Sequence, residues 1–347
     1  MGSAGSAGSA GSAGSAGSAG SAGSAGSAGS AGSRARAVGV LLLAASLGFG
    51  GQRAVGRAGA AGDVPRVPPA STLVLLGTGT PNADPDRWGP AVAVVVGDQS
   101  YLVDAGVGVV RRAAAAARDR HLPALAAERL TRVFLTHLHS DHTLGLPDLM
   151  FSPWVLDRPV PLDVYGPPGT AAMAQHIEEA WAEDIDIRLH GGEPLTTRNY
   201  HAVVHEVRPG EIYRDANVRV EAIAVQHGTW PVAFGFRFTM ADRTIVISGD
   251  TRPSDAIVDA CRGCDVLVHE VYSADRLTTR PANWQAYHKA FHTSTVELAG
   301  IAARAKPKLL VLYHQLFWGA SDEDLVREIH AAGYEGKVVS GKDLDIY

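Results

Sequence analysis

Three histidines and one aspartate lie between Thr136 and His142, directly after an apolar stretch that is typical of a buried strand. Neutral imidazole and carboxylate are ligands that zinc and related divalent ions prefer. In an extended loop, residues two apart face the same side, so His137 and His139 can share one ion while Asp141 and His142 turn toward a second. The stretch therefore indicates half of a two-metal site, and the fold has to bring the remaining ligands to it.

A cluster of surface histidines without metal is the alternative interpretation of this stretch. The chain has 14 histidines in 347 residues. At that frequency, the pattern His-x-His-x-Asp-His arises by chance on the order of once in a thousand such chains. We therefore favour the metal site. Two metal ions about 3.5 to 4 Å apart can activate water near neutral pH, so the pattern predicts a hydrolase.

The first 68 residues are expected to lie outside the folded domain. Residues 1–33 form a Gly-Ser-Ala low-complexity segment that has no side chains able to build a core. In residues 34–68, two arginines precede a short apolar run and a stretch of small residues, which is the layout of a signal peptide and linker. An uncleaved anchor is the alternative. We predict an exported protein, periplasmic or extracellular, with no stable membrane span in the mature chain.

Residues 69–347 are long enough for one large domain, which we expect to be the hydrolase domain. They contain 26 Lys and Arg against 35 Asp and Glu, a net charge of −9. An acidic surface argues against binding a phosphate backbone, which depends on Lys and Arg. The sequence leaves the oligomeric state open, a homodimer included.

The chain has two cysteines, Cys261 and Cys264. A single Cys-x-x-Cys lacks the second ligand pair of a structural zinc site. We favour packing, or a short disulfide after export, over a redox or metal role.

Short β-type runs alternate with alanine-rich helical stretches, an order that fits two packed sheets with helices outside. Functional residues are then expected in loops at strand ends, and His227, Asp250 and His314 each follow a predicted strand. Strands are predicted at 71–77, 91–96, 101–103, 132–136, 218–226, 232–239, 244–248, 265–269 and 309–313, and helices at 107–118, 169–183, 254–261, 294–305 and 321–332.

Ordered motifs give the chain a resemblance to a known family. They are Leu-Gly-Thr-Gly at 76–79, Leu-Val-Asp-Ala-Gly at 102–106, Thr-His-Leu-His-Ser-Asp-His at 136–142, Val-Gln-His-Gly at 225–228, Ser-Gly-Asp-Thr at 248–251 and Leu-Tyr-His at 312–314. In this order they resemble the metallo-β-lactamase superfamily. The resemblance implies an α/β (α+β) fold, the four-layer αβ/βα metallo-β-lactamase sandwich.

The same resemblance implies a centre of two Zn²⁺ per chain, with Mn²⁺ or Fe left open, and predicts no other cofactor site. The implied ligands are His137, His139 and His227 for the first ion, Asp141, His142 and His314 for the second, and Asp250 for both. Asp104 is expected to support the ligands without binding metal.

Within the superfamily, the runs Tyr165–Thr170, Val268–Glu270 and Phe291–Thr295 resemble the branch of ribonuclease Z-like proteins and exported arylsulfatase-like enzymes. The resemblance implies that His292 is the general acid, a role that suits its near-neutral pKa. Glu270 is expected to orient it or another histidine. The residues predicted to be catalytic are Asp141 and His292.

Three observations favour a small-molecule ester over nucleic acid as the substrate. No Gly-Pro-rich basic arm lies between Asp148 and His227, the run Glu178–Asp186 is acidic, and export would separate the enzyme from tRNA. We therefore expect an arylsulfatase-like hydrolase that acts on a sulfate ester. The alternatives are a ribonuclease Z-like phosphodiesterase and a lactonase or β-lactamase that acts on a carbonyl group.

Two further alternatives are disfavoured. An iron oxidoreductase of this fold would typically have Glu at the position of His139, and no flavin-binding domain follows. A non-catalytic metal-binding protein would not need so complete a ligand set. The aromatic residues near the motifs are expected either to line the pocket or to pack in the core: Trp154, Trp230, Phe317 and Trp318.

Overall fold

The computed structural model describes residues 70–195 and 198–347. The predicted low-complexity segment, 1–33, and the predicted signal peptide and linker, 34–68, lie outside the described residues. They stay predictions, as does export. Within the described ranges, no helix combines the length and the apolar character needed to cross a membrane.

The described strands form two sheets. The first sheet has six strands in sequential order, β1 to β6, and the second has seven, in the order β13 to β7. The first sheet contains β1 (Ser71–Gly77), β2 (Ala91–Val96), β3 (Gln99–Val103), β4 (Arg132–Phe134), β5 (Leu162–Gly166) and β6 (Ala202–Glu206). The second contains β7 (Gly210–Arg214), β8 (Val218–Val225), β9 (Ala233–Met240), β10 (Thr244–Ile247), β11 (Val266–Tyr272), β12 (Leu309–Leu316) and β13 (Val338–Ser340).

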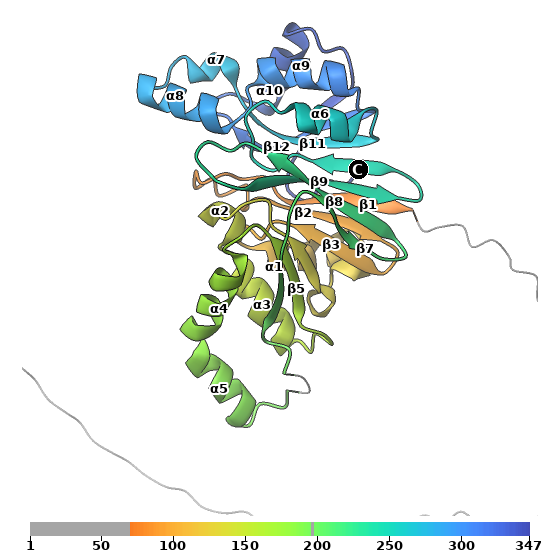
Figure 1. Cartoon of the computed structure of the whole chain (residues 1–347), viewed down its shortest axis with the longest axis vertical. Coiled ribbons are helices and arrows are strands. Elements are labelled where there is room, and N and C mark those ends of the chain that lie inside the picture. The colour runs from red at the N-terminus through yellow and green to blue at the C-terminus, as the bar shows by residue number, and fades with distance from the viewer. Residues whose placement is uncertain (1–69, 196–197) are drawn as a thin grey trace, which may run out of the picture. The chain divides into compact units, whose positions relative to one another are not determined.

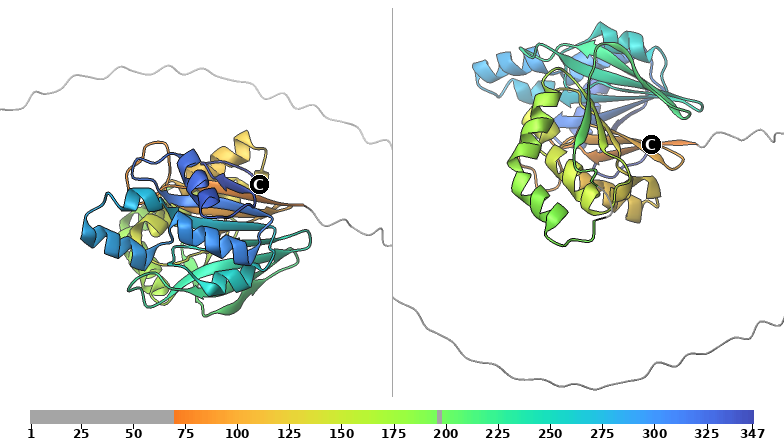
Figure 2. Two further views of the ribbon diagram at one scale, coloured as in Figure 1. Left: turned by 90° about the horizontal axis from the view of Figure 1, so that it is seen from above. Right: turned by 60° about the horizontal axis from the view of Figure 1, so that its bottom comes forward.

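Helices flank the two sheets, as Figures 1 and 2 show. Beside the first sheet lie α1 (Val109–Asp119), α2 (Ser140–Thr143), α3 (Leu146–Val155), α4 (Thr170–Ala180) and α5 (Ala182–His190), with the 3₁₀ turns Pro123–Leu125 and Ala127–Arg129. Beside the second lie α6 (Asp255–Cys261), α7 (Ala274–Leu277), α8 (Ala282–Phe291), α9 (Thr295–Ala305) and α10 (Asp322–Ala331).

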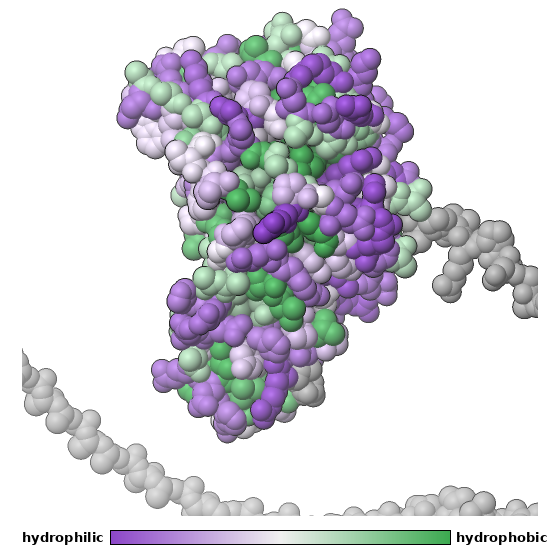
Figure 3. Space-filling view, in the orientation of Figure 1, coloured by the Kyte–Doolittle hydropathy of each residue, from purple (hydrophilic) through white to green (hydrophobic). Residues whose placement is uncertain are grey.

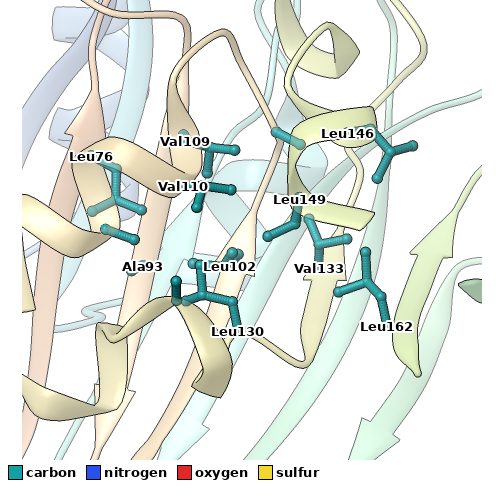
Figure 4. Close-up of a cluster of buried hydrophobic side chains, with 14 of the residues drawn as sticks. Leu76, Ala93, Leu102, Val109, Val110, Leu130, Val133, Leu146, Leu149 and Leu162 are labelled. Carbon is teal, nitrogen blue, oxygen red and sulfur yellow. The ribbon is translucent and has the colours of Figure 1, made fainter. Parts of the chain in front are cut away.

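Successive side chains of a strand point to opposite faces of its sheet, and the buried ones form three layers of hydrophobic core. In β1, Val74 and Leu76 face the core beneath the first set of helices, whereas Leu73 and Leu75 face the core between the sheets. Figure 4 shows the first of these cores, where side chains of α1 and α3 meet those of the sheet. A third core packs the second sheet against α6, α9 and α10. The architecture is therefore the predicted αβ/βα sandwich.

The relative direction of neighbouring strands determines at which edge of each sheet the loops with functional residues can cluster. Strands β3 to β6 pair in parallel, as do β10 to β13, while the pairs β1–β2, β2–β3, β7–β8, β8–β9 and β9–β10 are antiparallel. Parallel neighbours end at the same edge of their sheet, so the loops that follow them cluster there. The described residues also include a disulfide between Cys261 and Cys264, at the end of α6.

Apolar side chains also reach the surface. Leu144, Leu156 and Trp181 are among the exposed large hydrophobic residues. The face in Figure 3 shows such apolar residues interspersed with hydrophilic ones. A groove of about 800 Å³ lies beside α3 and α5, and Leu144, Leu156 and Trp181 line it.

Candidate metal centre

The predicted ligands come from the loops that follow three strands, from within a fourth strand and from one short helix. His137 follows β4, His227 follows β8, Asp250 follows β10, and His314 lies within β12. The helix α2 carries Asp141 and His142. These segments are far apart in the sequence, and the fold brings their side chains into one buried cluster.

His137, His139 and His227 form the first group. Nδ1 of His139 lies 3.0 Å from Nε2 of His137 and 3.1 Å from Nε2 of His227. One nitrogen from each ring therefore faces a common point, and the ligand atoms all lie within 4.8 Å of one another. Three imidazole nitrogens in this arrangement match the ligand set of a zinc site.

Asp141, His142 and His314 form the second group. Oδ2 of Asp141 lies 3.5 Å from Nε2 of His142 and 3.2 Å from Nε2 of His314. Oδ2 of Asp250 lies 3.5 Å from both of these nitrogens and 4.0 Å from Nε2 of His227. Asp250 thus stands between the two groups, at the position where one carboxylate can serve two ions.

A β-bulge aims His314 at the cluster. Along the pair β11–β12, Glu270 is opposite Tyr313 and Val271 is opposite Gln315, so His314 has no partner in the ladder. Its backbone takes the left-handed conformation, with a φ of 47°. A bulge of this kind redirects one side chain out of the strand's regular alternation, which here points the imidazole of His314 toward Asp141.

Hydrogen bonds behind the cluster fix which nitrogen of the His142 and His227 rings faces inward. Asp104 accepts hydrogen bonds from the backbone N–H of Thr136 and from Nδ1 of His142, each over 2.8 Å. Nδ1 of His227 donates to the backbone oxygen of Phe291 over 2.7 Å. With the proton on Nδ1, the lone pair of Nε2 is free to bind an ion.

The cluster also has the charge and the unpaired atoms that suit a cation. Nε2 of His142 and Oδ1 of Asp250 are buried without a hydrogen-bond partner. Burial raises the pKa of Asp250, but the imidazoles of His314 and His142 outweigh it and hold the pKa well below its usual range. Burial lowers the pKa of His142, but the carboxylates of Asp250 and Asp104 hold it well above its usual range. A divalent ion would displace that proton and satisfy both atoms.

His292, the predicted general acid, lies at the edge of the same cluster. Its Nδ1 is 3.4 Å from Oε2 of Glu270 and 3.9 Å from Oδ2 of Asp250. Glu270 is itself held by the backbone N–H of Thr293, which donates to its Oε1 over 2.9 Å. Burial lowers the pKa of His292 to about 4, and the carboxylate of Asp250 opposes this shift. His292 could also join His227 and Asp250 as a ligand, because these three form another compact group.

A cavity of about 360 Å³ opens onto these side chains, and we call it the cleft. The groove beside α3 and α5 is larger, but none of the predicted ligands lines it. The cleft is therefore where a substrate would meet the cluster. Its lining comprises Pro81, Asn82, His139, Ser140, Asp141, Asp250, Arg280, Trp284, Tyr287, His288, His292, His314, Leu316 and Trp318.

The beta-lactamase superfamily domain family matches residues 99–315 of the chain, a range that includes all seven predicted ligands. The chain belongs to the metallo-β-lactamase superfamily. This agrees with the resemblance that its motifs indicate, and it makes the chain a metal-dependent hydrolase.

Relatives place the chain in the ribonuclease Z branch of this superfamily. A ribonuclease Z from Mycobacterium bovis (strain BCG / Pasteur 1173P2) is 36% identical over 276 residues, which cover 78% of this chain and 96% of that protein. Among solved structures, the metallo-beta-lactamase fold protein YhfI from Bacillus subtilis matches with a TM-score of 0.62 and 20% identity, covering 81% of this chain and 99% of that one. The short form of human tRNase Z matches with a TM-score of 0.59 and 23% identity, covering 80% and 98%.

These relatives correct the predicted substrate. The similarity is to ribonucleases, so the prediction of an arylsulfatase-like enzyme acting on a small sulfate ester was wrong, as was the argument against nucleic acid. Net charge is an average over the whole surface, whereas binding depends on the residues at the site. No residue of the acidic run Glu178–Asp186 lines the cleft, and one arginine, Arg280, does.

The aromatic residues near the motifs separate into core and cleft. Trp154 is fully buried in the core beneath α3. Phe317 packs under the guanidinium group of Arg87, and Trp318 lines the cleft. The indole nitrogen of Trp230 lies 2.7 Å from Nε2 of His139, on the side of the ring away from the other ligands.

Sequence reasoning missed one wall of the cleft. Helix α8 was not predicted, and it carries Trp284, Tyr287 and His288, which all line the cleft. Their spacing of three and four residues places them on one face of a helix, and Phe291 continues the same stripe. That spacing was the signal that could have revealed the helix and its face.

Proposed function

We propose that the chain is a two-zinc phosphodiesterase that cleaves RNA, with precursor tRNA as its substrate. The observation that carries this proposal is the similarity to ribonuclease Z across 96% of that enzyme. The seven clustered side chains supply the chemistry it requires, because phosphodiester hydrolysis in a two-metal site needs ligands for both ions within one cleft.

In this proposal His137, His139 and His227 would hold the first ion, and Asp141, His142 and His314 would hold the second. Asp250, whose Oδ2 faces both groups, would help to hold both. The ions would supply activated water and neutralise negative charge on the phosphate. Asp104 and the backbone oxygen of Phe291 keep the rings of His142 and His227 in the required tautomer.

His292 moves the proton in this proposal. Its Nδ1 faces Glu270, so Nε2 is the nitrogen that can donate to the leaving oxygen. The low pKa of His292 means that the free imidazole is neutral at pH 7. The negative charge of a bound phosphate diester raises the pKa of a neighbouring imidazole, so the substrate itself favours the protonated form. Glu270 acts as a positioning residue through His292.

The substrate class can be tested directly with the purified chain in the presence of zinc. We expect cleavage of a precursor tRNA, scored on a gel, and no comparable turnover of an aryl sulfate, a lactone or a β-lactam. All four substrates would be hydrolysed at the same metal centre, so differences in turnover report which substrate the cleft recognises. Hydrolysis of the lactone or β-lactam without RNA cleavage would overturn the proposal in favour of a carbonyl hydrolase.

Zinc binding is expected to disturb Trp230. An indole N–H can only donate, so its 2.7 Å contact requires Nε2 of His139 to accept. When Nδ1 of His139 binds an ion, the proton occupies Nε2 and two donors face each other. We therefore expect titration of the metal-free protein with zinc to change tryptophan fluorescence, and Trp230→Phe to remove most of that change. An unchanged signal in Trp230→Phe would show that another tryptophan reports the binding.

A further inference from the structure

The segment that links β11 to the general acid forms one wall of the cleft. It includes α7 and α8 and ends at His292. Figure 1 shows these helices projecting beside the ends of the strands. Arg280, Trp284, Tyr287 and His288 come from this segment and line the cleft together with the predicted ligands. Metal chemistry does not use these four side chains.

The segment is anchored to the rest of the domain at both ends. The buried carboxylate of Glu328 accepts hydrogen bonds from the hydroxyl of Ser273 over 2.6 Å and from the backbone N–H of Ala274 over 2.9 Å. At the other end, the backbone oxygen of Phe291 accepts from the predicted ligand His227. The wall therefore has a fixed position relative to the metal centre, as a substrate subsite requires.

Trp284 presents an aromatic surface to the solvent at the cleft. Its ring stacks on His288, with centroids 5.7 Å apart and an interplanar angle of 24°. His288 in turn packs against Trp318 at 4.5 Å. Trp284 nevertheless remains 45% exposed. A tryptophan that served only the core would be buried, whereas a rigid, half-exposed indole at a cleft can stack on a nucleobase.

Arg280 is the single Lys or Arg among the described residues that line the cleft. Its guanidinium carbon lies 5.6 Å from the centroid of the Trp318 ring. Its Nε is buried without a hydrogen-bond partner, and among the described residues no carboxylate forms an ion pair with it. A guanidinium group held on an aromatic ring with free donors is suited to bind a phosphate.

We infer that Arg280 and Trp284 form a nucleotide subsite beside the metal centre, in which Trp284 stacks on a base next to the scissile bond and Arg280 binds a non-scissile phosphate. This inference rests on the proposed RNA substrate and deepens it. The cleft, at about 360 Å³, is within the size range of sites that hold one small ligand. Recognition by one base and one phosphate would add affinity without reading the sequence.

The first test combines protein variants with altered RNA. We expect Trp284→Ala to raise KM for cleavage of the precursor RNA about tenfold, the range of one base stacked on an aromatic ring. The variant should have no further effect on an RNA that lacks the bases flanking the cleavage position. Arg280→Ala should likewise raise KM for the unaltered RNA. It should have no further effect on an RNA in which the phosphate next to the scissile one is replaced by a neutral methylphosphonate. If the change in KM caused by a variant adds to the change caused by the matching alteration of the RNA, the two groups do not interact and the subsite is wrong.

Matched controls come from residues that do not line the cleft. Trp181 is exposed to a similar extent, 42%, but lines the groove beside α3 and α5. Arg118 on α1 is exposed and pairs with Asp119. Trp181→Ala and Arg118→Ala should leave KM unchanged within about twofold, the scatter expected of surface substitutions.

A binding measurement separates failure of the subsite from failure of the proposed function. Adenosine 3′,5′-bisphosphate, titrated by calorimetry into the zinc-loaded protein, should bind about tenfold more weakly to Trp284→Ala and to Arg280→Ala. If this difference is found but no RNA is cleaved, the subsite stands and the proposed RNA cleavage fails. If RNA is cleaved but both variants bind and cleave as the unaltered chain does, the subsite is wrong and the proposed function stands.

Discussion

Replacing Asp250 with alanine is expected to abolish hydrolysis of every phosphodiester substrate and to lower the zinc content from two ions per chain to one or none. Oδ2 of Asp250 faces His142, His227 and His314, so its loss affects both proposed ion positions at once. Two-metal sites contribute several kcal/mol of transition-state stabilisation, which corresponds to a loss of about a thousandfold or more in kcat/KM. Elemental analysis and single-turnover kinetics on the dialysed protein measure the two effects.

The Asp250 experiment needs a control for folding, because the residue is buried and surrounded by imidazoles. Asp255→Ala removes a carboxylate of the same size from an exposed position on α6, where it pairs with Arg304. This variant should retain its zinc and its activity. Asp250→Asn keeps the volume of the side chain but removes its charge, and it should unfold at a similar temperature while losing metal. Full activity in Asp250→Asn together with a normal zinc content would contradict the two-metal proposal.

Part of the ligand cluster was predictable because three of its seven members follow a strand that is rich in apolar and β-branched residues. Such a strand can be predicted from its composition, and the polar residue that follows it lies at the edge of the sheet. His137, His227 and Asp250 follow β4, β8 and β10 in this way. The sequence therefore indicated which residues meet, although it contained no information on distances.

His314 shows where that reasoning stops. It was predicted to follow its strand, but β12 continues through it to Leu316 and a bulge turns the side chain toward the site. A bulge depends on the register between two strands, and register is a property of the pair rather than of one sequence segment. No glycine marks the position, so nothing local distinguishes it from a regular strand residue.

Several helices were not predicted, and α3 and α8 were missed for different reasons. Helix α3 contains Pro153 and buries most of its residues, so it lacks both the composition and the amphipathic period of a surface helix. Helix α8 buries one residue, His288, because its aromatic face is turned toward the cleft rather than the core. Periodicity detects a helix by its buried face, and a face that lines a cleft is easily mistaken for surface.

The substrate prediction failed because it used whole-chain quantities for a local question. A net charge of −9 over residues 69–347 describes the average surface, and the acidic run on α4 and α5 lies outside the lining of the cleft. Inside the cleft, carboxylates that face imidazoles are neutralised once ions bind, which leaves Arg280 as an unpaired positive charge. Local charge at the cleft is thus compatible with a phosphodiester although the surface as a whole is acidic.

Replacing His292 with alanine is expected to lower kcat by about 10² to 10⁴ for RNA, the range that general acid catalysis contributes, while leaving zinc content unchanged. The role of His292 is to protonate the leaving oxygen, so the loss should shrink when the leaving group is a good one. Methyl 4-nitrophenyl phosphate releases nitrophenolate, which needs little protonation, and its hydrolysis should fall by less than about tenfold. Loss of zinc from His292→Ala would instead make His292 a ligand, in the group it can form with His227 and Asp250.

Glu270 supplies the final test of this role, because it reaches the substrate only through His292. Its Oε2 lies 3.4 Å from Nδ1 of His292, and its Oε1 accepts the backbone N–H of Thr293. Burial and the carboxylate of Asp250 hold the pKa of Glu270 well above its usual range, so its carboxyl group can share a proton with the imidazole of His292. Glu270→Gln keeps the shape of the side chain but cannot exchange that proton. We expect kcat for RNA to fall about tenfold with KM unchanged, and we expect no further loss when Glu270→Gln is added to His292→Ala. Additive losses in the double variant would show that Glu270 acts independently, so the two residues would not form one proton-transfer unit.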